Sequence, residues 1–124
     1  MLHEELTAKI LEARFEVSNE LGAGFLESVY QSALLVALKQ KNILAEAQVP
    51  LTVYFRDEIG GSFVADIVVD GKVILELKAV KELLSEHQAQ LINYLNPTHI
   101  QVGLLINFAK PKLQYKRLHR RRSI

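Results

Sequence analysis

Two strand-like segments flank the dipeptide Asp70-Gly71, a pair of residues typical of tight β-hairpin turns. Residues 63–69 and 72–79 are rich in β-branched and large apolar side chains, which favour strands. A third such segment, residues 48–55, precedes them across the polar, glycine-ended stretch 56–61. Three sequential strands joined by short turns predict an antiparallel meander, and this prediction constrains the fold more than any other feature of the chain.

Helical periodicity lies on both sides of this meander. Apolar residues recur every three or four positions in residues 4–21 and in residues 82–95, so both segments are predicted to be helices. The first is expected to end at the glycine that follows it, and the second at Asn96-Pro97. A second helix is expected from about residue 25 to residue 41, and a buried strand over residues 102–108. Because a strand that follows a crossover helix joins a sheet in parallel, the predicted fold is α/β (α+β), with one mixed sheet between helices.

The chain of 124 residues contains no cysteine. One domain is expected over residues 1–109, and any metal ion must be held by oxygen or imidazole ligands. The N-terminus is acidic and lacks the basic-then-apolar layout of a signal peptide, and no apolar run approaches the length of a transmembrane helix. We therefore expect a cytoplasmic protein.

The net charge of +1 is the sum of two opposite contributions. Residues 1–109 hold 8 Lys and Arg against 14 Asp and Glu (−6), whereas residues 110–124 hold 7 Lys and Arg and no acid (+7). Such a basic C-terminal tail is typical of contact with nucleic-acid phosphates, because neutralising phosphates releases counterions. A solubilising tail, or one folded onto the acids of the body, is an equally good interpretation. The candidate nucleic-acid-binding residues are Lys116, Arg117, Arg120, Arg121 and Arg122.

Side chains alternate across a strand, so Glu76 and Lys78 are expected on the same face of the hairpin. Whether Asp66 joins them depends on the number of residues in the turn. A two-residue turn at Asp70-Gly71 would put Asp66 on the opposite face, whereas a three-residue loop, Val69-Asp70-Gly71, or an equivalent bulge puts all three side chains together. We predict the odd-numbered loop. Two carboxylates and a lysine so placed suit magnesium-assisted attack on a phosphodiester, and the alternative is a surface hairpin whose charges are only solvated.

Two helical segments offer further polar side chains. His87, Gln90 and Tyr94 follow one another at offsets of three and four on the predicted 82–95 helix and form one polar stripe. They are candidates to reach a substrate phosphate or the lysine, unless the stripe is an ordinary solvent face. Glu27 is expected about three residues into the second helix, where a carboxylate interacts favourably with the helix dipole, and spacing alone favours this capping role.

The sequence GFLESVY at residues 24–30 resembles the signature of the GxxExxY protein family. Later segments resemble that family in the same order: Gln48-Val49-Pro50-Leu51, Ala65-Asp66, Glu76-Leu77-Lys78-Ala79-Val80, residues 87–94 and Leu105-Ile106-Asn107-Phe108. The family is placed in the PD-(D/E)xK nuclease superfamily, so the resemblance implies a restriction-endonuclease-like core with a mixed four-stranded sheet. Ala65 stands where the superfamily motif has proline, and Ser18 where many family members have histidine.

The resemblance also implies roles for particular side chains. Asp66, Glu76 and Lys78 correspond to the metal-binding and catalytic residues of the superfamily, and Glu27 to an acid of the first helix that often joins the metal site. Gln90 and Tyr94 resemble the glutamine-tyrosine helix motif of its exonuclease-related branch. The resemblance therefore implies that these two side chains support catalysis.

The leading hypothesis is therefore a Mg²⁺-dependent (or Mn²⁺-dependent) nuclease that hydrolyses DNA in preference to RNA. The alternative is a catalytically inactive nuclease-fold module that binds nucleic acid or a partner protein. A third hypothesis is an interaction module that forms a homodimer through an apolar surface.

Overall fold

The fold is built on one twisted sheet with helices on both faces. The computed structural model describes residues 2–109 and 114–120. Its elements, in chain order, are α1 (Glu4–Leu21), α2 (Glu27–Gln40), β1 (Ala45–Phe55), β2 (Glu58–Val69), β3 (Val73–Lys78), α3 (Ser85–Thr98), β4 (Val102–Asn107) and β5 (Gln114–His119). No helix in the described part of the chain is long and apolar enough to cross a membrane.

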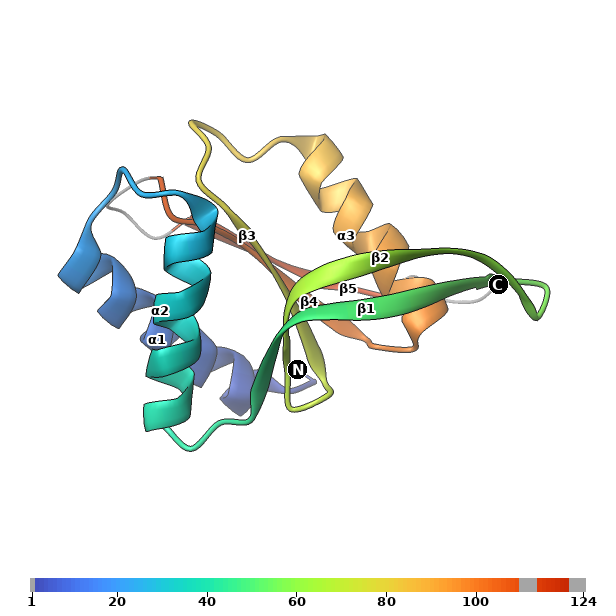
Figure 1. Cartoon of the computed structure of the whole chain (residues 1–124), viewed down its shortest axis with the longest axis horizontal. Helices are drawn as coiled ribbons and strands as arrows, with labels where there is room; N and C mark the ends of the chain where they lie inside the picture. Colours follow the sequence, from blue (N-terminus) through green and yellow to red (C-terminus); the bar gives the residue numbers. More distant parts are fainter. Residues whose placement is uncertain (1, 110–113, 121–124) are drawn as a thin grey trace.

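The strands lie in the order β1-β2-β3-β4-β5. Neighbouring strands are antiparallel except β3 and β4, which are parallel and are joined by the crossover helix α3. Figure 1 shows α1 and α2 together on one side of the sheet and α3 on the other, and it shows β1 and β2 extending as a long ribbon. The predicted mixed sheet between helices is confirmed.

The sheet has one strand more than the four that were predicted. Strand β5 pairs with β4 from Val102 and His119 to Asn107 and Gln114, so it lies within the segment assigned above to a basic tail. Charged side chains hid it from pattern analysis, yet lysine and arginine are common on edge strands because they discourage further pairing. Residues 110–113 and 121–124 lie outside the described residues.

Two predicted element boundaries are also wrong. Asn96-Pro97 does not end α3, which starts at Ser85 and continues through Pro97 to Thr98. Pro97 has no amide hydrogen for the helical bond to the residue 93 carbonyl oxygen, and in the same last turn the Thr98 hydroxyl donates to the Tyr94 carbonyl oxygen at 2.8 Å. The polar stretch 56–61 contains a turn of only two residues, because Glu58 already pairs with Phe55 and belongs to β2.

Buried side chains form one cluster on each face of the sheet. The cluster under α1 and α2 includes Ile10, Leu34 and Leu75, and the cluster under α3 includes Leu91 and Leu105. Leu91 packs so closely on Gly103 that a Cβ atom there would lie 3.0 Å from its side chain. The helices are therefore held against the sheet by apolar contacts, as the 3.6-residue periodicity predicts.

A buried arginine ties α1 to the end of the sheet. Arg14 donates from Nη2 to the carbonyl oxygen of Asn107 at 2.8 Å, and its guanidinium lies 5.3 Å from the centroid of the Phe108 ring. Burial lowers the pKa of Arg14. The Asn107 amide donates to the Val80 carbonyl oxygen at 2.7 Å and accepts from the Val80 amide at 3.1 Å. This network fixes the carboxyl ends of β3 and β4 side by side.

Tyr30, the last residue of the GxxExxY signature, is a scaffold residue. Its side chain is fully buried and stacks on Phe108 with a centroid distance of 4.5 Å. Its hydroxyl donates to the Gly22 carbonyl oxygen at 2.7 Å and accepts from the Phe25 amide at 3.3 Å. One phenol therefore fastens the loop between α1 and α2 to the core and sets where α2 begins.

We expect Tyr30→Phe to lower the free energy of unfolding by about 1–2 kcal/mol, because the Gly22 carbonyl and the Phe25 amide both lose their hydrogen-bonding partner. Urea denaturation followed by circular dichroism measures the change. Tyr54→Phe, at a position that is 55% exposed, is the matched control and should unfold like the wild type. Equal stability of the two variants would show that the Tyr30 hydroxyl does not hold this loop.

Candidate functional site

Strands β2 and β3 diverge before β3 ends. Their ladder covers only Val69 with Val73, Val68 with Ile74, and Ile67 with Leu75, whereas β3 continues to Lys78. Beyond Leu75, two backbone amides on this edge of the strand are bound by side chains instead of by a neighbouring strand. These are the amides of Leu77 and Ala79.

Two carboxylates from different elements accept these amides. Asp66 of β2 accepts from the Leu77 amide at 2.7 Å, and Glu27 of α2 accepts from the Ala79 amide at 2.9 Å. Because each carboxylate accepts a hydrogen bond from the backbone of this strand, the strand sets the position of the carboxylate. The divergence of the two strands thus creates the place where acids gather.

The turn between β2 and β3 has the odd number of residues that was predicted, but not the predicted residues. Val69 pairs with Val73, so the loop is Asp70-Gly71-Lys72 instead of Val69-Asp70-Gly71. The Lys72 amide donates to the Val69 carbonyl oxygen at 2.9 Å, which closes a tight turn over Asp70 and Gly71, both at positive φ. Continuing the register past Ile67 and Leu75 places Asp66 opposite Glu76.

Glu76 is half-buried and faces Asp66. Burial, followed by the negative charge of Asp66, raises the pKa of Glu76 to about 8, while the charge of Lys78 acts in the opposite direction. Glu76 Oε1 is buried and has no hydrogen-bonding partner among the described residues. The structure therefore brings Asp66, Glu76 and Lys78 together, with Glu76 protonated at neutral pH.

A pocket with a volume of about 420 Å³ lies beside these acids. Its lining residues come from α2, β1, β2 and β3: Glu27, Ser28, Gln31, Gln48, Asp66 and Leu77. Glu27 and Asp66 thus share one pocket although they are 39 positions apart in the sequence. Glu27 is the first residue of α2, not the third, and its carboxylate accepts from Ala79 of another segment.

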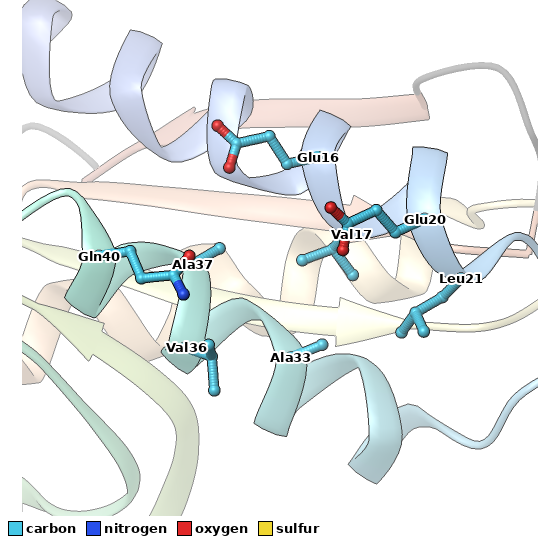
Figure 2. A pocket seen from close by; sticks show the side chains of 8 residues that line it. All are labelled: Glu16, Val17, Glu20, Leu21, Ala33, Val36, Ala37 and Gln40. Atoms are coloured by element: carbon cyan, nitrogen blue, oxygen red, sulfur yellow. The ribbon is translucent and has the colours of Figure 1, made fainter.

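A different pocket lies between α1 and α2 and has a volume of about 310 Å³ (Figure 2). It is lined by Glu16, Val17, Glu20, Leu21, Ala33, Val36, Ala37 and Gln40. None of the predicted site residues lines it, so it is separate from the site at the strand divergence.

The polar stripe of α3 is not bonded to these carboxylates. Tyr94 stacks on Phe63 of β2 with a centroid distance of 3.6 Å, and His87 accepts from the Leu84 amide at 3.0 Å through Nδ1. Gln90 is exposed. In the described part of the chain, none of the three side chains has a hydrogen bond to Asp66, Glu76 or Glu27.

The predicted nucleic-acid-binding residues lie partly on β5. Lys116 is exposed and pairs with Leu105, which pairs with Glu76, so Lys116 lies two strands or about 10 Å from Glu76 across the sheet. Arg117 bonds to the Leu2 carbonyl oxygen and to His119, and the Arg120 amide donates to the Gln101 carbonyl oxygen. Arg121 and Arg122 lie outside the described residues.

The site offers oxygen ligands that suit a hard divalent cation such as Mg²⁺. In residues 2–109 and 114–120, no three His, Asp or Glu side chains form a ready metal-ligand cluster. The facing pair Asp66 and Glu76 still fits such a cation, because Glu76 Oε1 lacks a partner and a raised pKa marks a carboxyl group that a nearby positive charge would ionise. Glu27 lines a pocket together with Asp66.

The comparisons with known proteins agree with the fold. The family model of the PD-(D/E)XK nuclease superfamily matches residues 4–118, and the chain belongs to this superfamily. Among solved structures, the fold is similar to the crystal structure of SSO0001, with a TM-score of 0.62 and 17% sequence identity. That similarity covers 98% of this chain and 61% of the other. A search of curated proteins gave no match.

Sequence reasoning missed Gln31 and Ser28 of α2 as pocket residues, and gave no role to Gln48. Helical spacing from Glu27 would have put Gln31 on the same face of α2, since the two are four positions apart. Nothing in the sequence marks the backbone conformation of Gln48, which lies in a strand but has a φ of 51°.

The raised pKa of Glu76 predicts a pH-dependent stability. Between its ordinary pKa of 4.5 and about 8, the folded protein binds a proton that the unfolded chain has released, so the free energy of unfolding falls as pH rises through this window. Glu76→Gln is neutral throughout, and should gain stability relative to the wild type from pH 5 to pH 9. Urea denaturation in EDTA measures this difference.

Glu20→Gln, at an exposed position of α1, is the matched control for the loss of one acidic side chain. Its stability should follow that of the wild type over the same pH range. A constant difference between Glu76→Gln and the wild type from pH 5 to pH 9 would contradict the buried, proton-binding state of Glu76.

Proposed function

We propose that the protein is a Mg²⁺-dependent or Mn²⁺-dependent nuclease that hydrolyses phosphodiester bonds of DNA. The observation that carries this proposal is the arrangement where β2 and β3 diverge: Asp66 faces Glu76 and shares a pocket with Glu27, and Lys78 lies two residues from Glu76. Membership of the PD-(D/E)XK nuclease superfamily supports a nucleic-acid substrate.

Each acid has a definite task in this proposal. Asp66 and Glu76 would hold the cation, and Glu27 would be an accessory ligand from the far side of the pocket. Hydrogen bonds from the Leu77 and Ala79 amides keep Asp66 and Glu27 in place before any ligand arrives. A bound divalent cation would stabilise negative charge on the phosphate and make a water ligand more acidic.

Glu76 must lose its proton to become a ligand. Because its pKa is about 8, cation binding should release a proton at neutral pH and become tighter as pH rises toward 8. Lys78 supplies a positive charge beside Glu76, and we assign it to offset the charge that develops on the attacked phosphate.

The remaining predicted residues would serve the substrate. Gln90 and Tyr94 lie on α3. Tyr94 stacks on Phe63, which lies three residues before Asp66 in β2, and this contact holds α3 near β2. Lys116 lies in the same cross-sheet row as Glu76 and would attract the phosphodiester backbone. Arg117, Arg120 and, outside the described residues, Arg121 and Arg122 would add positive charge to this end of the chain.

The direct test is cleavage of labelled single-stranded, double-stranded and branched DNA, and of RNA, in Mg²⁺ and in Mn²⁺. We expect cleavage of DNA that stops in EDTA and falls at least about 100-fold in Asp66→Asn and in Lys78→Met. Lys81→Met, an exposed lysine three residues beyond Lys78, is the matched control and should retain activity.

Circular dichroism and calorimetry with Mn²⁺ accompany this test. Asp66→Asn should fold like the wild type and lose Mn²⁺ binding, whereas Lys78→Met should fold and still bind Mn²⁺. A metal-loaded wild-type protein that cleaves none of these substrates, or an Asp66→Asn variant as active as the wild type, would overturn the proposed function.

A further inference from the structure

One residue of β1 has a backbone conformation that is unusual for a strand. Gln48 has a φ of 51°, in the left-handed region that residues with a side chain rarely adopt. The pairs Ala47 with Ile67 and Val49 with Ala65 flank it, so Gln48 lies directly opposite Asp66 at a position where the ladder is interrupted. Glycine or asparagine would adopt this conformation more readily, so a glutamine here needs another reason.

The side chain of Gln48 supplies that reason. Its Nε2 atom donates to Oε1 of Gln31 at 2.6 Å, and both residues line the pocket that holds Asp66 and Glu27. Gln31 lies one helical turn after Glu27 on α2, so the same face of this helix presents an acid and an amide to the pocket. The two amides join α2 to β1 across the pocket wall.

This amide pair keeps hydrogen-bonding capacity for a ligand. With one bond between them, Gln31 retains both Nε2 hydrogens and Gln48 retains the second hydrogen of its Nε2, and these donors can bind a phosphate oxygen. The pocket volume of about 420 Å³ corresponds to about 14 water molecules at roughly 30 Å³ each, which leaves space beside a hydrated cation for part of a substrate.

We infer that Gln48 and Gln31 form a positioning pair that binds the phosphodiester backbone next to the bond to be cleaved. The inference rests on the proposed function and extends it to how the substrate is held. A neutral amide can donate to a phosphate oxygen among acids, whereas a lysine or arginine at either position would pair with Asp66 or Glu27 and compete with the cation. The contact is with the backbone, so it is independent of base sequence.

The test compares Gln48→Gly and Gln31→Ala with the wild type. Gln48→Gly removes the amide and relieves the left-handed backbone, so the midpoint of thermal unfolding should stay the same or rise by about 4 °C. The Kd for a labelled DNA oligonucleotide, measured by fluorescence anisotropy with Ca²⁺ in place of Mg²⁺, should rise about tenfold in both variants. In cleavage assays KM should rise while kcat changes little.

Two controls separate a substrate contact from a structural or metal-binding role. Gln40→Ala changes an exposed glutamine of the same helix, α2, and should bind DNA like the wild type. The Kd for Mn²⁺, measured by calorimetry, should be unchanged in Gln48→Gly and Gln31→Ala but lost in Asp66→Asn.

Wild-type DNA affinity in both glutamine variants would overturn the inference and leave the proposed nuclease function intact. Loss of Mn²⁺ binding in Gln48→Gly and Gln31→Ala would also overturn it, because the pair would then serve the cation. Absence of nucleic-acid binding and cleavage by the wild-type protein would overturn the nuclease function and this inference together.

Discussion

The organisation of the site depends on how the backbone amides of Leu77 and Ala79 are satisfied after β2 leaves β3. A strand edge without a neighbouring strand needs other acceptors, and here they are the carboxylates of Asp66 and Glu27. The same two hydrogen bonds complete the strand and hold the acids at one pocket. In this member of the PD-(D/E)XK nuclease superfamily, the need to satisfy the backbone therefore also places the acids of the candidate site.

The framework around the divergence keeps it rigid. Arg14 and Asn107 join α1, the end of β4 and the segment after β3, and Tyr30 fastens the start of α2, which carries Glu27. Packing on both faces of the sheet leaves few ways for these ends to move apart. Glu76 is held partly buried beside Asp66, and burial followed by the negative charge of Asp66 raises the pKa of Glu76.

The spacing of apolar residues and the odd number of residues in the hairpin loop were sufficient to predict much of the fold and part of the site. Helical spacing and β-rich segments predict the order of the first seven elements. The odd-numbered loop is predicted because only such a loop puts Asp66 and Glu76 on the same face of the hairpin. The predicted loop residues were wrong by one position, because Val69 still pairs with Val73 and Lys72 belongs to the loop. Strand β5 was missed because its residues are mostly polar and charged, and only pairing with β4 makes them a strand.

By itself, the sequence determined the order and type of most elements and the residue types from which a site could be made. Local spacing carries that information, since each helix or strand buries its own apolar face. Only the tertiary structure decided that Glu27 meets Ala79, that Glu76 retains its proton, and that Gln48 turns its amide toward Gln31. These properties depend on burial and on contacts between distant segments, which no local pattern of residues encodes.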